Sequence, residues 1–292
     1  MSLVILAAYA VGILLGSWAG RHPRMAAVWP RYVRAQLLLA AVVLSVLAAW
    51  RLTAVADVVW PLLIIGVYAA ILVLSLLITR GERRLGIGTL RAWTATSNTG
   101  FFTIPFTAAF GGPAALAVAV LVDRFGMPVW ATYVHLLRRD APIKQRARTS
   151  FIDQAPLIAL VVGLALHLVG PAPQWTGPVS LAMAPVFAMT GSAVFVGSIL
   201  HPSQKIDPRP GIWPWARLIL VRTVLLGAIV LAAPNDDVRL VAVLGALSIP
   251  AFGPSQMSTV YGYREPAVAA SIRYAWWLGG LGVIAGWWLT HR

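Results

Sequence analysis

The sequence predicts an all-α polytopic membrane protein with ten membrane-spanning helices. Three observations predict this fold class. The 292 residues are 59% hydrophobic and only 11% charged, whereas a soluble domain carries about 25% charged residues. The apolar residues form long runs, each sufficient for a bilayer core that needs about 17–25 residues. Two of these runs are interrupted by Gly and Pro, in corresponding positions of the two halves of the chain.

The ten apolar runs divide the chain into two halves of five spans. Residues 1–137 form the first predicted five-helix repeat, and residues 151–292 form the second. The connections are short, no cleavable signal is recognised, and the first span is expected to start at the N-terminus. We expect spans near residues 2–19, 34–51, 58–79, 89–110, 114–137, 151–169, 179–200, 213–233, 238–262 and 266–289.

Two of the spans, the fourth and the ninth, are predicted to be broken. The fourth contains Asn98, Gly100 and Pro105, and the ninth contains Pro250 and Pro254. Gly weakens a helix, and Pro removes a donor and clashes with the preceding turn. Freed backbone is tolerated at membrane depth only where protein buries it or where it lines a cavity. Paired interruptions of this kind are the best sequence-level indication of a transporter binding site.

Short sequence matches indicate that the two halves are related by an inverted repeat. The fifth span opens with Gly-Pro-Ala at 112–114 and the tenth follows Glu265 with Pro-Ala, each directly after a broken span. The first span carries Val-Gly-Ile at 11–13, and the sixth carries Val-Gly-Leu at 162–164. The order of these matches, rather than their length, predicts the repeat, and an odd number of spans in each half gives the halves opposite topology.

Basic residues set the predicted orientation. The net charge is +14, and seventeen of the 23 Lys and Arg residues lie in the odd-numbered connections. The even-numbered connections and the C-terminus hold only Arg51, Arg239 and Arg292. The positive-inside rule then places the odd connections in the cytoplasm and both termini outside. Because most of the basic residues lie in short connections between spans, we do not expect a nucleic-acid partner. The absence of Cys excludes disulfides and thiolate metal sites.

Polar side chains at the two breaks are the candidate substrate ligands. A break places helix ends inside the membrane, and free N–H groups at a helix N-terminus favour an anion. Asn98, Thr99, Ser255 and Gln256 add neutral donors and acceptors there. Asn98 and Gln256 could instead only cap freed backbone groups. Because the breaks occupy matching places, we favour the binding-site interpretation.

Asp123 is the only acidic residue in the middle of a predicted span. A buried ionisable group is costly in lipid, so Asp123 is a candidate proton carrier or cation ligand. Its alternative role is an ion pair. We expect Arg273 to be the partner, because in opposed repeats the two depths differ by about one helical turn, roughly 5 Å. Arg124 is a poor expected partner because adjacent helical residues face different directions. The two roles are compatible.

Arg222 lies within the eighth span and admits two interpretations. It could hold a substrate carboxylate in a bidentate pair. It could also extend its side chain to the cytoplasmic interface, since it lies about two turns from the start of the span. We favour the second interpretation.

The motifs around the two breaks resemble those of the auxin efflux carrier (PIN-type) family and its bacterial members. Asn98 to Pro105 matches that family's pattern of Asn, a small residue, Gly, Phe and a later Pro. Pro250 to Gln256, followed by Tyr-Gly at 261–262, matches its second break, although Ser255-Gln256 stands where the family often has Asn. The layout also resembles the related bile acid/sodium symporter superfamily.

The resemblance implies crossed, broken helices near the membrane midplane. It further implies a static scaffold of spans 1, 2, 6 and 7, and a transport domain of spans 3–5 and 8–10. We expect a homodimer formed through the scaffold. The predicted function is an elevator-type secondary transporter of a small organic anion, a carboxylate above all, in the cell (inner) membrane. Proton and sodium coupling are both left open.

Other function classes are less well supported. A sodium-coupled carrier usually has carboxylates near its breaks, and only Asp123 is available. A receptor that keeps the fold without transport is the other alternative. An enzyme is not expected, because neither a pair of intramembrane aspartates nor a His-Glu-x-x-His motif is present. No cofactor, catalytic residue or metal site is predicted.

Overall fold

The structure is a computed structural model that describes residues 1–52, 56–78, 93, 95–140, 155–199, 212–251 and 266–291. Every secondary-structure element in these ranges is helical, which confirms the all-α prediction. The elements are α1 (Ser2–Arg21), α2 (Pro23–Trp50), α3 (Ala56–Ile78), the π-helical turn η2 (Thr99–Thr103), α5 (Ile104–Phe110), α6 (Gly112–Phe125), α7 (Met127–Asp140), α8 (Ala155–Val169), α9 (Thr176–Ile199), α10 (Ile212–Ala232), α11 (Asp236–Ala246) and α13 (Pro266–His291).

The helices follow the predicted spans with two clear differences. Helix α2 begins at Pro23, well before the predicted residue 34, because Pro is favoured in the first turn of a helix. The predicted span 114–137 divides at Gly126 into α6 and α7. Pro128, two residues later, has no N–H to donate, which explains why the helical hydrogen bonding is interrupted there.

Among the described residues, three helical stretches are long and apolar enough to cross a membrane. By length and composition these are Ser2–Arg21, Val58–Leu77 and Gly112–Leu136, the last counted across Gly126. Large apolar side chains also point outward on several helices: Leu3, Leu168 and Leu231 are 82%, 86% and 87% exposed. A membrane fold fits these features, and the count of ten spans remains a prediction.

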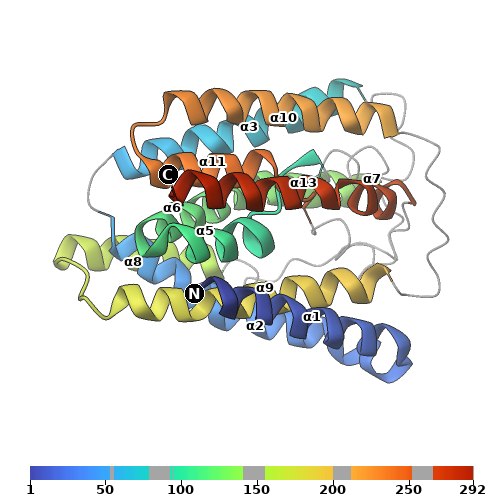
Figure 1. The fold of residues 1–292 in the computed structure, drawn as a ribbon, viewed down its shortest axis with the longest axis horizontal. Helices are drawn as coiled ribbons and strands as arrows, with labels where there is room; N and C mark the ends of the chain where they lie inside the picture. Colours follow the sequence, from blue (N-terminus) through green and yellow to red (C-terminus); the bar gives the residue numbers. More distant parts are fainter. Residues whose placement is uncertain are drawn as a thin grey trace.

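Helices α1, α2, α8 and α9 pack together and are called the lower group, after their place in Figure 1. Helix α1 packs along α9, and α2 packs along α8. Glycines allow the close approach. A Cβ atom on Gly12 would overlap the Met189 carbonyl of α9, and one on Gly163 would overlap the Val46 carbonyl of α2. Small residues let helix backbones approach closely where apolar lipid provides no driving force for association.

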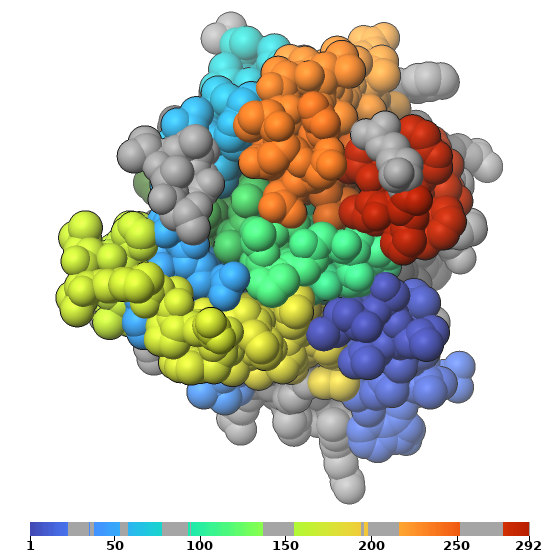
Figure 2. Space-filling view, turned by 60° about the vertical axis from the view of Figure 1, so that its left-hand side comes forward, coloured from blue at the N-terminus to red at the C-terminus, as the bar shows by residue number. Residues whose placement is uncertain are grey.

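The remaining helices form a second set, called the upper group: η2 and α3, α5, α6, α7, α10, α11 and α13. Helix α10 packs against α3 and α11, and α11 packs against α13. Helices α5 and α6 lie between these elements and the lower group, as Figures 1 and 2 show. The two groups therefore meet where η2, α5 and α6 contact the four helices of the lower group.

Both chain termini lie toward the same end of the molecule, on the left of Figure 1. The connection between α8 and α9 and the connection between α10 and α11 lie at that end too. The turn at His22 between α1 and α2 lies at the opposite end. A chain with an even number of membrane spans, such as the predicted ten, would have both termini at one end.

Candidate functional site at the crossing of two chain breaks

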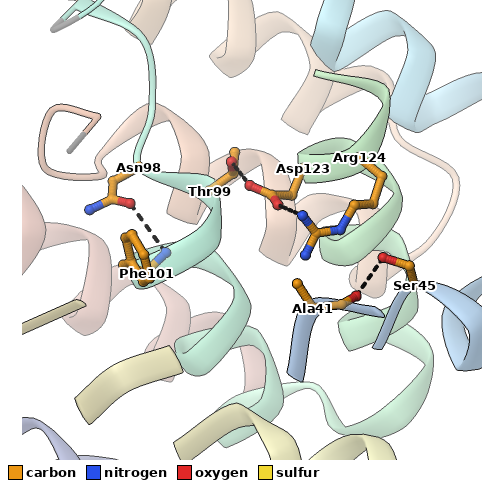
Figure 3. Close-up of polar contacts among 7 residues, drawn as sticks. All are labelled: Ala41, Ser45, Asn98, Thr99, Phe101, Asp123 and Arg124. Carbon is orange, nitrogen blue, oxygen red and sulfur yellow. Dashed lines mark hydrogen bonds and ion pairs between the residues drawn. The ribbon is translucent and has the colours of Figure 1, made fainter. Parts of the chain in front are cut away.

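The first break lies at Asn98, as the sequence predicts. Thr96, Ser97 and Asn98 leave the helical conformation, and η2 begins at Thr99. Asn98 caps this turn, because its Oδ1 accepts a hydrogen bond from the Phe101 N–H at 3.2 Å (Figure 3). Its backbone carbonyl accepts from both Phe102 and Thr103. An Asn side chain is well suited to this role, since it satisfies a donor that the helix start leaves free.

Pro105 changes the hydrogen bonding of the same turn. Proline has no N–H to donate to the turn before it. The Phe101 carbonyl, four residues earlier, accepts instead from the Tyr9 hydroxyl of α1 at 2.6 Å. Tyr9 also stacks on Phe106, with ring centroids 5.2 Å apart. Tyr9, a residue of the lower group, therefore stabilises the first break. Sequence reasoning did not predict this contact.

The second break meets the first directly. Helix α11 ends at Ala246, and residues 248–251 are not helical. The Asn98 N–H donates to the Ile249 carbonyl at 3.1 Å, and the Ala251 N–H donates to the Thr96 carbonyl at 3.0 Å. Ser97 and Pro250 face each other in this isolated antiparallel bridge. The two interrupted segments, about 150 residues apart in sequence, thus satisfy each other's backbone groups.

We call the place where residues 96–98 pair with residues 249–251 the crossing. Serine hydroxyls add further hydrogen bonds there. Ser97 Oγ donates to the Gly245 carbonyl at 2.6 Å, and Ser248 Oγ accepts from the Asn98 N–H at 3.1 Å. Asn98, Ser97 and Ser248 are all buried. Each break therefore supplies polar side chains to the other, in the interior of the protein.

Arg222 binds the carbonyl ends of both broken segments. Its side chain is completely buried, and its guanidinium donates to the carbonyls of Ala95, Ala246 and Ser248 at 3.2, 3.1 and 2.9 Å. Ala95 and Ala246 are the last helical residues before their breaks. Carbonyls at a helix C-terminus have no partner in the helix and carry partial negative charge. The predicted extension of Arg222 to the interface is therefore wrong, because these carbonyls hold it inside.

Asp123 lies beside the first break. Its Oδ1 accepts a hydrogen bond from Thr99 Oγ1, and its Oδ2 pairs with Arg124 Nη1 at 3.0 Å (Figure 3). A Cβ atom on Gly100 would lie 3.3 Å from Asp123 Oδ1, so the glycine admits the carboxylate next to η2. The expectation that Arg124 is a poor partner for Asp123 was therefore wrong. The two Cβ atoms diverge, but the long Arg side chain folds back toward its neighbour.

Several polar atoms of the site have no hydrogen-bond partner among the described residues. Asn98 Nδ2 is one of them, and Arg124 Nε and Nη2 are two more. All three are buried, and buried polar groups are usually satisfied. The Asn98 side chain therefore caps η2 with its oxygen and keeps its nitrogen available, so capping and ligand binding are compatible at this residue.

The structure brings together some predicted site residues and does not reach others. Asn98, Thr99, Gly100, Pro105 and Pro250 all lie at the crossing. The predicted ligands Pro254, Ser255 and Gln256 lie outside the described residues, as does the side chain of Arg273. The Asp123–Arg273 pair thus remains a prediction. Charged residues inside apolar spans were the sequence signal for Arg222 and Arg124.

No protein-family model matches the chain, and no curated protein matches it.

Proposed function

We propose that this protein is a secondary transporter of the cell (inner) membrane that carries a small organic anion, a carboxylate, by elevator-type alternating access. The single observation that carries the proposal is the pairing of Asn98 with Ile249 and of Ala251 with Thr96. Two broken segments that satisfy each other inside a helical protein form the kind of irregular backbone that builds transporter binding sites. The motif resemblance to the auxin efflux carrier family points the same way.

Helix packing supports the proposed inverted repeat. Exchange of the two halves would convert the α1–α9 contact into the α8–α2 contact, and both contacts are extensive in the structure. Gly12 and Gly163, which occupy matching motifs, each lie where a neighbouring helix backbone approaches too closely for a Cβ atom. The two breaks pair with each other, which an inverted repeat would explain as the meeting of two equivalent segments.

The division into two helix groups supports the elevator mechanism. The lower group contains the helices assigned to the scaffold, and the upper group contains both breaks. Contacts between the groups run through η2, α5 and α6. In the proposed motion the upper group slides past the lower group and carries the crossing with it. The homodimer through the scaffold is part of the same proposal.

The proposed orientation places both termini outside the cell. The termini lie at one end of the molecule (Figure 1), and Arg51 and Arg239 are the few basic residues expected near that end. A tag on Met1 should react with a membrane-impermeant reagent in intact cells. A tag that reacts only after lysis would place the N-terminus in the cytoplasm and reverse the proposed orientation.

Flux measurement in proteoliposomes tests the proposed function. The purified chain is reconstituted, and uptake of radiolabelled acetate, benzoate and succinate is measured with proton and sodium gradients imposed separately. We expect saturable, protein-dependent flux of at least one carboxylate, absent from protein-free liposomes and for the neutral amide benzamide. Saturable binding without any flux would favour a receptor on this fold. Flux that requires sodium would identify the sodium-coupled alternative.

A further inference from the structure

Arg124 combines deep burial with an unused hydrogen-bonding edge. Its side chain is 5% exposed, and it lies in the last turn of α6. Nη1 pairs with Asp123 at 3.0 Å, whereas Nε and Nη2 have no hydrogen-bond partner among the described residues. A buried cation that leaves two donors unused is costly, because each lost hydrogen bond with water must be replaced. The two unpaired nitrogens therefore favour a ligand that accepts their hydrogen bonds.

The two unused nitrogens define the chemistry of that ligand. Nε and Nη2 share one edge of the planar guanidinium, and their N–H groups point in parallel. This fork matches the two oxygens of a carboxylate, which it binds with two parallel hydrogen bonds. We propose that this edge of Arg124 binds the carboxylate group of the transported anion. The inference rests on the proposed function and names the anchoring residue.

Asp123 and Thr99 act as positioning residues in this arrangement. Asp123 holds the far nitrogen, Nη1, and is itself held by the Thr99 hydroxyl of η2. These two contacts fix the plane of the guanidinium and link it to the first break. The Asp123 charge offsets the buried Arg124 charge while the site is empty, so the cation does not stand alone in the protein interior.

The position of Arg124 relates the site to the proposed elevator motion. In Figure 3 the guanidinium lies between Asp123 and the Ala41–Ser45 turn of α2. Ser45 Oγ donates to the Ala41 carbonyl at 2.6 Å, and no hydrogen bond joins this described turn of α2 to Arg124. Helix α2 belongs to the lower group, and α6 belongs to the upper group. Sliding of one group past the other would uncover the free edge of Arg124.

Arg222 is a second buried arginine in which only Nε has no hydrogen-bond partner among the described residues. Both of its terminal nitrogens donate to backbone carbonyls. Arg124 differs because an entire bidentate edge is open. Arg222 therefore stabilises the crossing, whereas the open edge of Arg124 is available to an anion.

Binding measurements on purified protein test the inference. The probes are acetate, benzoate and succinate, with chloride and benzamide as controls, and affinity is measured by calorimetry for the wild type, Arg124→Lys and Arg217→Lys. Lys keeps the charge but lacks the fork, so Arg124→Lys should weaken the binding of the best carboxylate about ten- to a hundredfold. Arg217 is an exposed arginine on α10, and Arg217→Lys should bind as the wild type does.

A measurement on the wild type covers the case in which Arg124→Lys does not fold. Phenylglyoxal modifies accessible guanidinium groups, and peptide mapping locates the modified residue. The carboxylate that binds, but not benzamide, should protect Arg124 from modification. Failure of Arg124 to react under any condition would overturn the inference, because an anion must be able to reach the same edge.

The outcomes separate this inference from the proposed function. Carboxylate binding by Arg124→Lys within twofold of the wild type would overturn the role of Arg124 and leave transport intact as a proposal. Absence of carboxylate binding to the wild type would also overturn it. Arg124-dependent binding in a protein that shows no flux would overturn the transport function alone.

Discussion

At the scale of single residues, the described part of the interior holds two buried arginines with different roles. The two terminal nitrogens of Arg222 donate hydrogen bonds to three backbone carbonyls. In Arg124, Nη1 pairs with Asp123, whereas Nε and Nη2 have no hydrogen-bond partner among the described residues. Since unpaired carbonyls at two helix ends would repel each other, a cation between them stabilises the crossing. Arg222 is thus a structural residue, and its loss should be measured as lost stability.

Arg222→Gln should lower the free energy of unfolding by about 2–4 kcal/mol, because a neutral amide cannot satisfy all three buried carbonyls. Arg222→Lys keeps the charge and should cost less. Chemical denaturation in detergent measures both values. Arg217→Gln, at an exposed position of α10, should change stability by less than about 0.5 kcal/mol. Equal stability of the Arg222→Gln and Arg217→Gln proteins would show that Arg222 does not hold the crossing.

Two substitutions distinguish the role of the Asn98 side-chain oxygen from that of its nitrogen. Asn98→Ala removes both the cap and the free nitrogen, and should cost about 1 kcal/mol of stability and most of the transport. Asn98→Ser can still cap Phe101 but has no amide nitrogen. It should therefore keep wild-type stability within about 0.5 kcal/mol and still lose transport. Normal transport by the Asn98→Ser protein would reduce Asn98 to a helix cap.

At the scale of elements, glycine decides how closely α1 and α9 approach. A Cβ atom on Gly12 would overlap the Met189 carbonyl, and one on Gly16 would overlap the Ala193 carbonyl. Neither contact lies at the flexible end of a side chain, so the helices would have to separate. Gly66 of α3 provides the opposite case, because nothing lies within 4 Å of an added Cβ atom.

Gly12→Ala should therefore destabilise the protein by about 1–3 kcal/mol, the usual range for overpacking. Gly66→Ala should be neutral or stabilise by up to about 1 kcal/mol, since Ala is the better helix former. Thermal unfolding of the two variants side by side measures the difference. A Gly12→Ala protein as stable as Gly66→Ala would contradict the close α1–α9 packing.

The sequence predicts the elements of this protein better than their contacts. Long apolar runs define helices, and Gly with Pro marks the breaks near Asn98 and Pro250, because both signals are local. The division at Gly126 is a weaker local signal and was missed. The Asn98–Ile249 pairing and the three carbonyls around Arg222 join distant parts of the chain. Spacing along one chain does not show which carbonyls lie near which side chain.

At the scale of the whole molecule, the proposed elevator requires the two helix groups to move past each other. Gly177 of α9 and Pro113 of α6 lie across the boundary between them, and a Cβ atom on Gly177 would lie 3.5 Å from the Pro113 Cβ. That separation suits a disulfide, whose Cβ atoms lie about 3.5–4.5 Å apart. The chain has no cysteine, so an introduced pair has no competing thiol.

The double variant Gly177→Cys, Pro113→Cys should therefore transport when reduced and stop when oxidised. The control joins α13 to Leu247, the residue that follows α11 in the upper group. A Cβ atom on Gly282 would lie 3.1 Å from the Leu247 Cβ, slightly closer than in an ordinary disulfide. Gly282→Cys with Leu247→Cys should keep its flux in both redox states, because these segments are expected to move together. Proteoliposome flux before and after oxidation, with cross-linking quantified by gel mobility, measures both. Undiminished flux through a fully cross-linked α9–α6 pair would exclude sliding of the upper group past the lower group, since a disulfide fixes that boundary.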